Sequence, residues 1–166
     1  MSPASYLIAR NISLIYNSLN YAKDNINIWY KAIENKRKIR VVTIHNNLKL
    51  DHYLKADKPY LISWDRARID MPIYDLVSLY QNNYLDFEFS DILRLYLNKY
   101  PLNDEEMLLF LTIISIPGKI KYESSEYKTV LEVRRLIDYI CKTSELRKEY
   151  RIEKKTDKRS EEHTSE

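Results

Sequence analysis

The sequence contains very little glycine and cysteine and has no long hydrophobic run. Gly118 is the only glycine in 166 residues, which excludes a phosphate-binding loop of the Walker or G-x-G-x-x-G type, because those loops need several glycines. The single Cys141 excludes an internal disulfide, and its apolar surroundings predict a core residue. The longest apolar run, residues 107–116, is far shorter than the roughly 20 residues that span a bilayer. We therefore expect a cytoplasmic protein with no membrane partner.

Length and charge are those of one globular domain. Hydrophobic residues make up 45% of the chain and charged residues 31%, which suits a packed core rather than a disordered chain. The net charge of +3 does not by itself indicate nucleic acid. The strongest basic cluster is Lys36, Arg37, Lys38 and Arg40. We interpret it as a solvated helix end, where cations complement the helix dipole; a nucleic-acid contact is the alternative and is not expected.

The C-terminal residues have an unusual composition. Residues 159–166 resemble the translation of a common short-read sequencing adapter, so we interpret them as an assembly artefact and leave them out of functional reasoning. They carry one positive and three negative charges, and without them the net charge becomes +5. Residues 146–158 are predicted to form a charged extension that frays. The natural N- and C-termini are left open.

Apolar spacing predicts a mainly helical domain with a small β element, an α+β fold. A short strand at 39–44 is expected to deliver His45, and the segments 53–55 and 60–64 to form a hairpin. The predicted helices cover residues 5–21, 25–35, a segment from Pro72 onward, 90–99 with Ser90 as its cap, 103 to the stop at Pro117, and 125–142.

Polar side chains recur in three short segments between residues 45 and 76, namely HNNLKLDH (45–52), LISWD (61–65) and DMPIYDL (70–76). Phosphoryl transfer needs a carboxylate that orients the attacking hydroxyl and two oxygen ligands for magnesium. Kinases place the first two groups on a loop of the form H-x-D-x-x-x-x-N and the third on a nearby strand. In the first segment, His45 holds the His position, Asn47 the Asp position and His52 the Asn position.

The order and spacing of these segments resemble the C-terminal lobe of the aminoglycoside phosphotransferase and choline kinase-like superfamily, most closely its spore-coat kinase-like branch. The resemblance covers residues 1–145 and implies a protein-kinase-like C-lobe whose catalytic-loop hairpin lies at about 40–65. It places Ser63 at the position of the metal-ligand Asp, and His45 and Asp75 at positions that brace the catalytic loop. The family's N-terminal lobe, which supplies the ATP lid and the phosphate-binding lysine, has no counterpart in this chain.

The chain departs from the family pattern at its reactive positions. Asn47 cannot accept a proton at neutral pH, and a general base contributes about 10²–10⁴ in rate. His52 offers an imidazole and Ser63 a neutral hydroxyl where magnesium prefers oxygen anions. The resemblance therefore implies a pseudokinase, a non-catalytic binding or scaffolding protein without a cofactor. Its partner would be an unidentified protein or a small hydroxylated ligand.

Two alternatives stay open. Asp65 follows Ser63 by two residues, so on a strand both would project to the same face, and Asp51 lies next to His52. A shifted metal site at Asp65 and Asp51 would make the protein an active, divergent small-molecule kinase that uses Mg-ATP to phosphorylate a hydroxyl. The third hypothesis is a basic helical nucleic-acid-binding protein that uses residues 36–40, which predicts a steep loss of binding with added salt.

Overall fold

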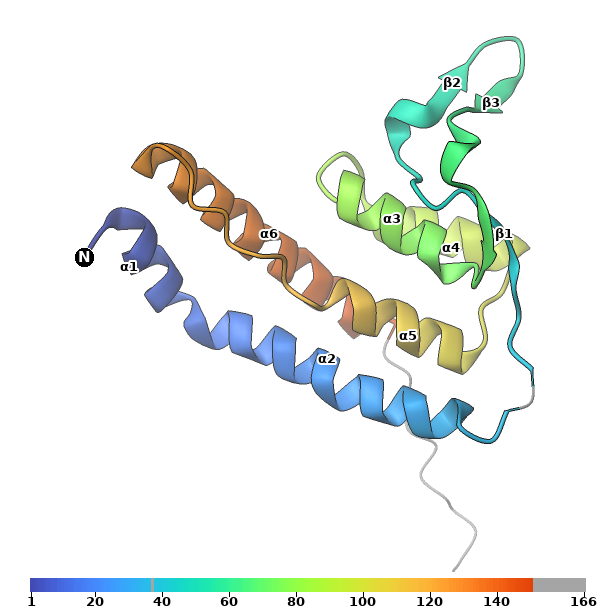
Figure 1. Ribbon diagram of the computed structural model, residues 1–166, viewed down its shortest axis with the longest axis horizontal. Helices are drawn as coiled ribbons and strands as arrows, with labels where there is room; N and C mark the ends of the chain where they lie inside the picture. Colours follow the sequence, from blue (N-terminus) through green and yellow to red (C-terminus); the bar gives the residue numbers. More distant parts are fainter. Residues whose placement is uncertain (37, 151–166) are drawn as a thin grey trace, which may run out of the picture.

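The computed structural model describes residues 1–36 and 38–150 (Figure 1). These residues are mainly helical with two small two-stranded sheets, which confirms the predicted α+β class. The helices are α1 (Pro3–Arg10), α2 (Ile12–Ile33), α3 (Ile73–Asn83), α4 (Phe89–Lys99), α5 (Asp104–Ile114) and α6 (Glu126–Glu149). The strands are β1 (Val42–Ile44), β2 (Tyr53–Lys55), β3 (Pro59–Leu61) and β4 (Arg68–Asp70), and short 3-10 helices cover η1 (Leu50–His52) and η2 (Trp64–Arg66).

Helix α5 lies at the centre of the hydrophobic core. It packs against α2 on one side and α3 on the other, while α6 packs against α1 and α2. Figure 1 shows the axes of α2, α5 and α6 roughly parallel, with the β2–β3 hairpin projecting beyond α3. Strand β1 pairs with β4, and β2 pairs with β3, both antiparallel. The sheets therefore lie at one end of the helical body.

The sequence around α5 explains its central position. Asn103 caps the helix: its side chain accepts a hydrogen bond from the Glu106 amide, and the Glu106 carboxylate accepts one from the Asn103 amide. This reciprocal capping box satisfies two amide groups at the helix start. Leu109, Phe110 and Ile114 are all buried. The predicted start at 103 is confirmed.

None of the described helices combines the length and apolar character that a membrane crossing requires.

The N-terminal helices differ from the two predicted at 5–21 and 25–35. The helical conformation is interrupted at Asn11, whose φ of −107° and ψ of 13° are not helical. Helix α2 then continues without interruption to Ile33. The Asn11 side chain donates a hydrogen bond to the Leu7 carbonyl, a local bond that competes with helix continuation. Asn25 donates to the Tyr21 carbonyl from inside α2. Because no glycine or proline lies between 21 and 25, nothing there ends the helix.

The last helix is longer than predicted, and Cys141 lies outside its buried face. Helix α6 continues to Glu149, so the predicted extension from 146 begins inside it. Cys141 is exposed, so the prediction of a core cysteine is wrong; it lies about 100° around the helix from the buried Ile140. Residues 151–158 and the adapter-like residues 159–166 lie outside the described residues. The buried residues of α6 are Thr129, Val133, Ile140, Thr143 and Leu146.

Helix α4 begins one residue before its predicted cap. Glu88 occupies the N-cap position without a side-chain hydrogen bond, and Ser90 lies inside the first turn. The Ser90 carbonyl instead accepts a hydrogen bond from the Tyr150 hydroxyl at the end of α6. The local preference of serine for the cap position is not realised here.

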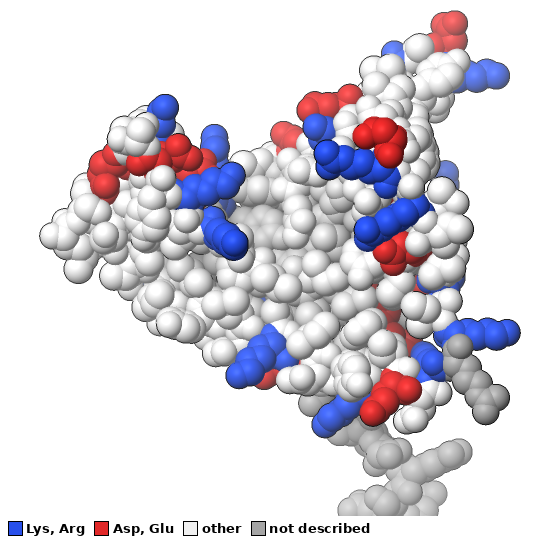
Figure 2. Space-filling view, viewed as in Figure 1, with Lys and Arg blue, Asp and Glu red and all other residues white. Residues whose placement is uncertain are grey.

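Aromatic side chains join α3 to α6. Tyr80 is fully buried, its ring lies edge-on to Phe89, and its hydroxyl shares a hydrogen bond of 2.9 Å with Thr143. Burial raises the pKa of Tyr80 to about 12, because the phenolate would lose its hydration. Figure 2 shows few charged side chains over α1 and the first half of α2.

Candidate functional site: the loop after strand β1

The loop that follows β1 lies beside the start of α3. Strand β1 pairs with β4 in a register that sets Val42 opposite Asp70 and Ile44 opposite Arg68. The chain then turns from β4 through the buried Met71 and Pro72 into α3. This short path carries Asp75, in the first turn of α3, to the loop that begins at His45.

The carboxylate of Asp75 accepts two backbone hydrogen bonds from this loop. The His45 amide donates to Asp75 Oδ2 and the Asn46 amide to Oδ1, each at 2.8 Å. A carboxylate in the first turn of a helix is also stabilised by the helix dipole. Asn46 has a φ of 60°, a left-handed conformation that asparagine adopts more readily than most residues. These contacts are what a loop-bracing role for Asp75 and His45 requires.

His45 links the loop to the segment before Ser63. Its side chain is fully buried, and Nε2 lies 2.7 Å from the Ile62 carbonyl oxygen. Because a carbonyl only accepts, Nε2 carries a hydrogen. The His45 ring packs against Trp64 and His52, with centroid distances of 5.0 and 5.2 Å. The Nδ1 atoms of His45 and His52 are both buried and have no hydrogen-bond partner within the described residues.

The middle of the loop is fixed to α3. The Leu48 carbonyl accepts hydrogen bonds from the Ser78 hydroxyl and the Asn82 side chain. The Leu50 amide donates to Asn83 Oδ1 at 3.1 Å. These three residues of α3 were not predicted as site residues. Their hydroxyl and amide side chains, on a helix that also buries Leu76, Val77 and Tyr80, were the available signal.

The predicted reactive positions differ in exposure. Asn47 is half-buried, His52 is only 9% exposed, and Ser63 is exposed. Ser63 has a φ of 65° and occupies the N-cap position of η2 without a side-chain hydrogen bond. The buried ring of His52 lies against the ring of His45.

The predicted strand at 60–64 is shorter than expected, because β3 ends at Leu61 before Ser63 and Asp65. Ser63 is left-handed and Asp65 lies in the 3-10 helix η2, so strand alternation does not place them on one face. The Asp65 side chain is 73% exposed and lies 4.0 Å from Arg66, and Asp51 is exposed in η1. Within the described residues, no three His, Cys, Asp or Glu side chains gather as a metal site would require. The geometry therefore adds no support for a shifted magnesium site.

Two residues of the basic cluster, Lys36 and Arg40, form ion pairs with α5, while Lys36 and Lys38 remain exposed to solvent. Lys36 forms an ion pair with Glu105 at 2.6 Å. Arg40 pairs with the buried Glu106, donates to the Pro101 carbonyl, and lies over the Tyr100 ring at 4.4 Å. The hydrogen bond to Glu106 raises the pKa of Arg40, and that from Lys36 lowers the pKa of Glu105. Arg37 lies outside the described residues. Two of the four cations of the cluster are therefore already paired with carboxylates and are less available to a phosphate backbone.

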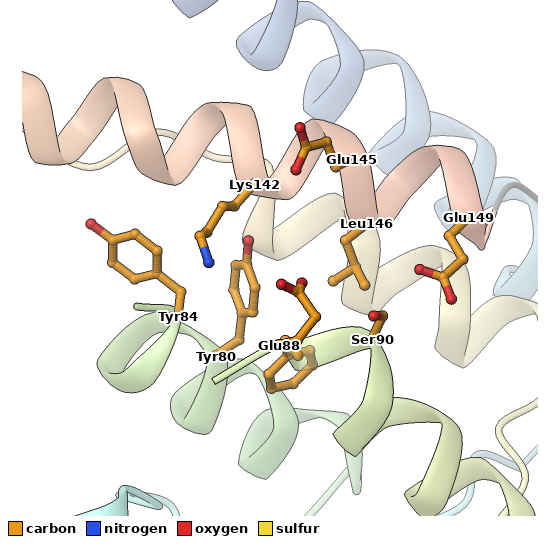
Figure 3. Close-up of a pocket in the computed structure, with 9 residues that line it drawn as sticks. Tyr80, Tyr84, Glu88, Ser90, Lys142, Glu145, Leu146 and Glu149 are labelled. Carbon is orange, nitrogen blue, oxygen red and sulfur yellow. The ribbon is translucent and has the colours of Figure 1, made fainter. Parts of the chain in front are cut away.

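A separate pocket lies between α3, α4 and α6. It has a volume of about 70 Å³, which suits ordered water and is well below the size of a nucleotide site. Figure 3 shows Lys142 reaching into it from α6 and Glu88 from the start of α4. We therefore do not assign this pocket as the functional site.

Comparison of the chain with protein-family models, curated proteins and solved structures gave no match.

Proposed function

We propose that this chain is a pseudokinase of the aminoglycoside phosphotransferase and choline kinase-like superfamily, a C-lobe that binds a partner in the cytoplasm without catalysing phosphoryl transfer. The observation that carries the proposal is the double hydrogen bond from the His45 and Asn46 amides to Asp75. A loop selected for binding alone would keep its backbone conformation, while its reactive side chains would be free to change. The partner is an unidentified protein or a small hydroxylated ligand.

The conformation of the loop is fixed by contacts that do not involve the predicted reactive side chains. Asp75 fixes its beginning, Asn83 fixes Leu50, and His45 ties it to the Ile62 carbonyl. Two of these contacts are to α3 and the third is to the segment after β3, and together they restrict the conformation of the loop. Such preorganisation benefits a binding site, because less conformational entropy is lost when a partner binds.

The side chains at the reactive positions argue against catalysis. Asn47 lacks the basic oxygen that orients an attacking hydroxyl. The buried His52 imidazole and the neutral Ser63 hydroxyl are poor magnesium ligands. Asp65 and Asp51, the substitutes in the divergent-kinase alternative, both project into solvent without converging partners. No observation favours that alternative over the pseudokinase.

A restoration variant tests the proposal. The triple substitution Asn47→Asp, His52→Asn and Ser63→Asp returns the kinase residues to a loop whose supports are unchanged. We expect calorimetric titration with ATP to detect magnesium-dependent binding in the variant and none in the wild-type chain. Asp and Asn both tolerate left-handed backbone, so position 63 accommodates the change.

The matched control carries Ser63→Asn with the same two other substitutions. It has the same shape at position 63 but no negative charge, so it should bind magnesium-ATP at least about tenfold more weakly, a difference of about 1.4 kcal/mol. Equal binding by the two folded variants, or none by either, would contradict the assignment of these positions.

A further inference from the structure

Helix α2 carries a row of exposed apolar side chains, which we call the α2 stripe. It consists of Ile12, Tyr16, Leu19, Ile26 and Tyr30, with exposed fractions of 40%, 58%, 40%, 39% and 59%. The buried positions of the same helix, Ser18 and Ala22, lie on the side that faces α5 and α6. The large apolar side chains of the stripe are therefore outside the core, and the small residues are inside it.

The spacing of the stripe matches the seam of a helix pair. With Lys23 included, its positions advance by 4, 3, 4, 3 and 4 residues, from 12 through 16, 19, 23 and 26 to 30. Alternating steps of 3 and 4 give the 3.5-residue repeat with which two helices pack side chains along a shared line. The order of steps is the same in both chain directions. A stripe with this property is complementary to a second copy of itself turned end to end, as two-fold symmetry requires.

We propose that the α2 stripe is the contact of an antiparallel homodimer. The two-fold axis passes near residue 21, which sets Ile12 opposite Tyr30 of the second copy and Tyr16 opposite Ile26 of the second copy. Each pair joins an aliphatic and an aromatic side chain. The contact lies on a different face from the loop at His45, so it stands or falls independently of the proposed function.

Lys23 determines the direction of the pairing. In a parallel dimer in register, Lys23 would lie beside Lys23 of the second copy, and two like charges would share a desolvated seam. In the antiparallel arrangement, Lys23 lies opposite Leu19 of the second copy. Its alkyl chain then covers an apolar surface while the ammonium group reaches water. The one charge in the stripe therefore favours the antiparallel arrangement.

The size of the contact is sufficient for a reversible dimer. Burying these five side chains on both copies removes roughly 1,000 Å² from water, near the lower limit for a specific interface. Charge does not oppose the contact, because α2 contains only Lys23, Asp24 and Lys31 as charged residues among 22. Figure 2 shows a largely uncharged surface over its first half. We expect association in the micromolar range.

Sedimentation equilibrium of the full chain tests the dimer. The wild-type protein should pass from monomer to dimer across micromolar concentrations, and Leu19→Glu should weaken association at least about tenfold, because it places a charge in the seam. The control is Ile28→Glu: Ile28 is 44% exposed and lies nine residues on, about 180° around α2. It should dimerise as the wild type does. A wild-type monomer throughout, or a loss of the dimer with Ile28→Glu alone, would overturn the proposal.

Cysteine pairing tests the direction. In a Cys141→Ser background, chains carrying Tyr16→Cys are mixed with chains carrying Ile26→Cys and oxidised. We expect disulfides between the two kinds of chain to predominate at least about tenfold over those between chains of one kind. A predominance of pairs within one kind would indicate a parallel dimer and overturn the antiparallel assignment. Circular dichroism of each variant checks that it is folded.

Discussion

Replacing Asp75 with alanine should lower the free energy of unfolding by about 2–4 kcal/mol, because two backbone amides lose a charged acceptor. The His45 and Asn46 amides both donate to this carboxylate, each at 2.8 Å. Chemical denaturation measures the loss. Hydrogen exchange monitored by NMR should also show faster exchange of these two amides, with α5 still protected.

Asp65→Ala is the matched control for this change. Asp65 is a carboxylate of the same type only ten residues away, but it is 73% exposed and its one ion pair is long. Its removal should change stability by no more than about 0.5 kcal/mol. If Asp75→Ala were as mild as Asp65→Ala, or left the exchange of the two amides unchanged, the bracing role of Asp75 would be wrong.

The substitution Arg40→Met should also cost about 2–4 kcal/mol. It leaves the Glu106 carboxylate, whose side chain is only 3% exposed, without its cation. Removing one partner of a buried ion pair is strongly destabilising, since the remaining charge is uncompensated. The expected loss of stability is near the lower end for a broken buried ion pair, because the Arg40 side chain is 36% exposed. Thermal or chemical denaturation measures the change.

Two further variants separate the charge from the packing. Lys36→Met breaks the more exposed pair with Glu105 and should cost less than about 1 kcal/mol. The double variant Arg40→Met with Glu106→Gln should recover part of the loss, because no buried charge remains. A double variant no more stable than Arg40→Met alone would contradict this account of the pair.

Much of the helical framework could be predicted because its signals are local. Apolar spacing gave the α+β class, and the capping residues at Asn103 located the start of α5. Helix lengths were less predictable. The end of α6 depends on contacts of Thr143 and Leu146 with distant elements, and these contacts extend the helix through a charged stretch.

The site was less predictable than the fold. The placement of Asp75 relied on a resemblance, since a carboxylate 30 residues away in sequence has no local signal. The pairing of Arg40 with Glu106 spans 66 residues, which is why the cluster could be interpreted as solvated. The left-handed Ser63 was also missed, because serine rarely adopts this backbone conformation and tertiary contacts decide where it does.

The most direct test of the central claim is a calorimetric titration of the wild-type chain with ATP, in the presence and absence of Mg²⁺. Asn47 is not a general base, and His52 and Ser63 are poor magnesium ligands. We therefore predict no magnesium-dependent binding of ATP. Saturable binding that requires Mg²⁺ and disappears in Asp65→Ala would contradict the pseudokinase and identify a divergent kinase.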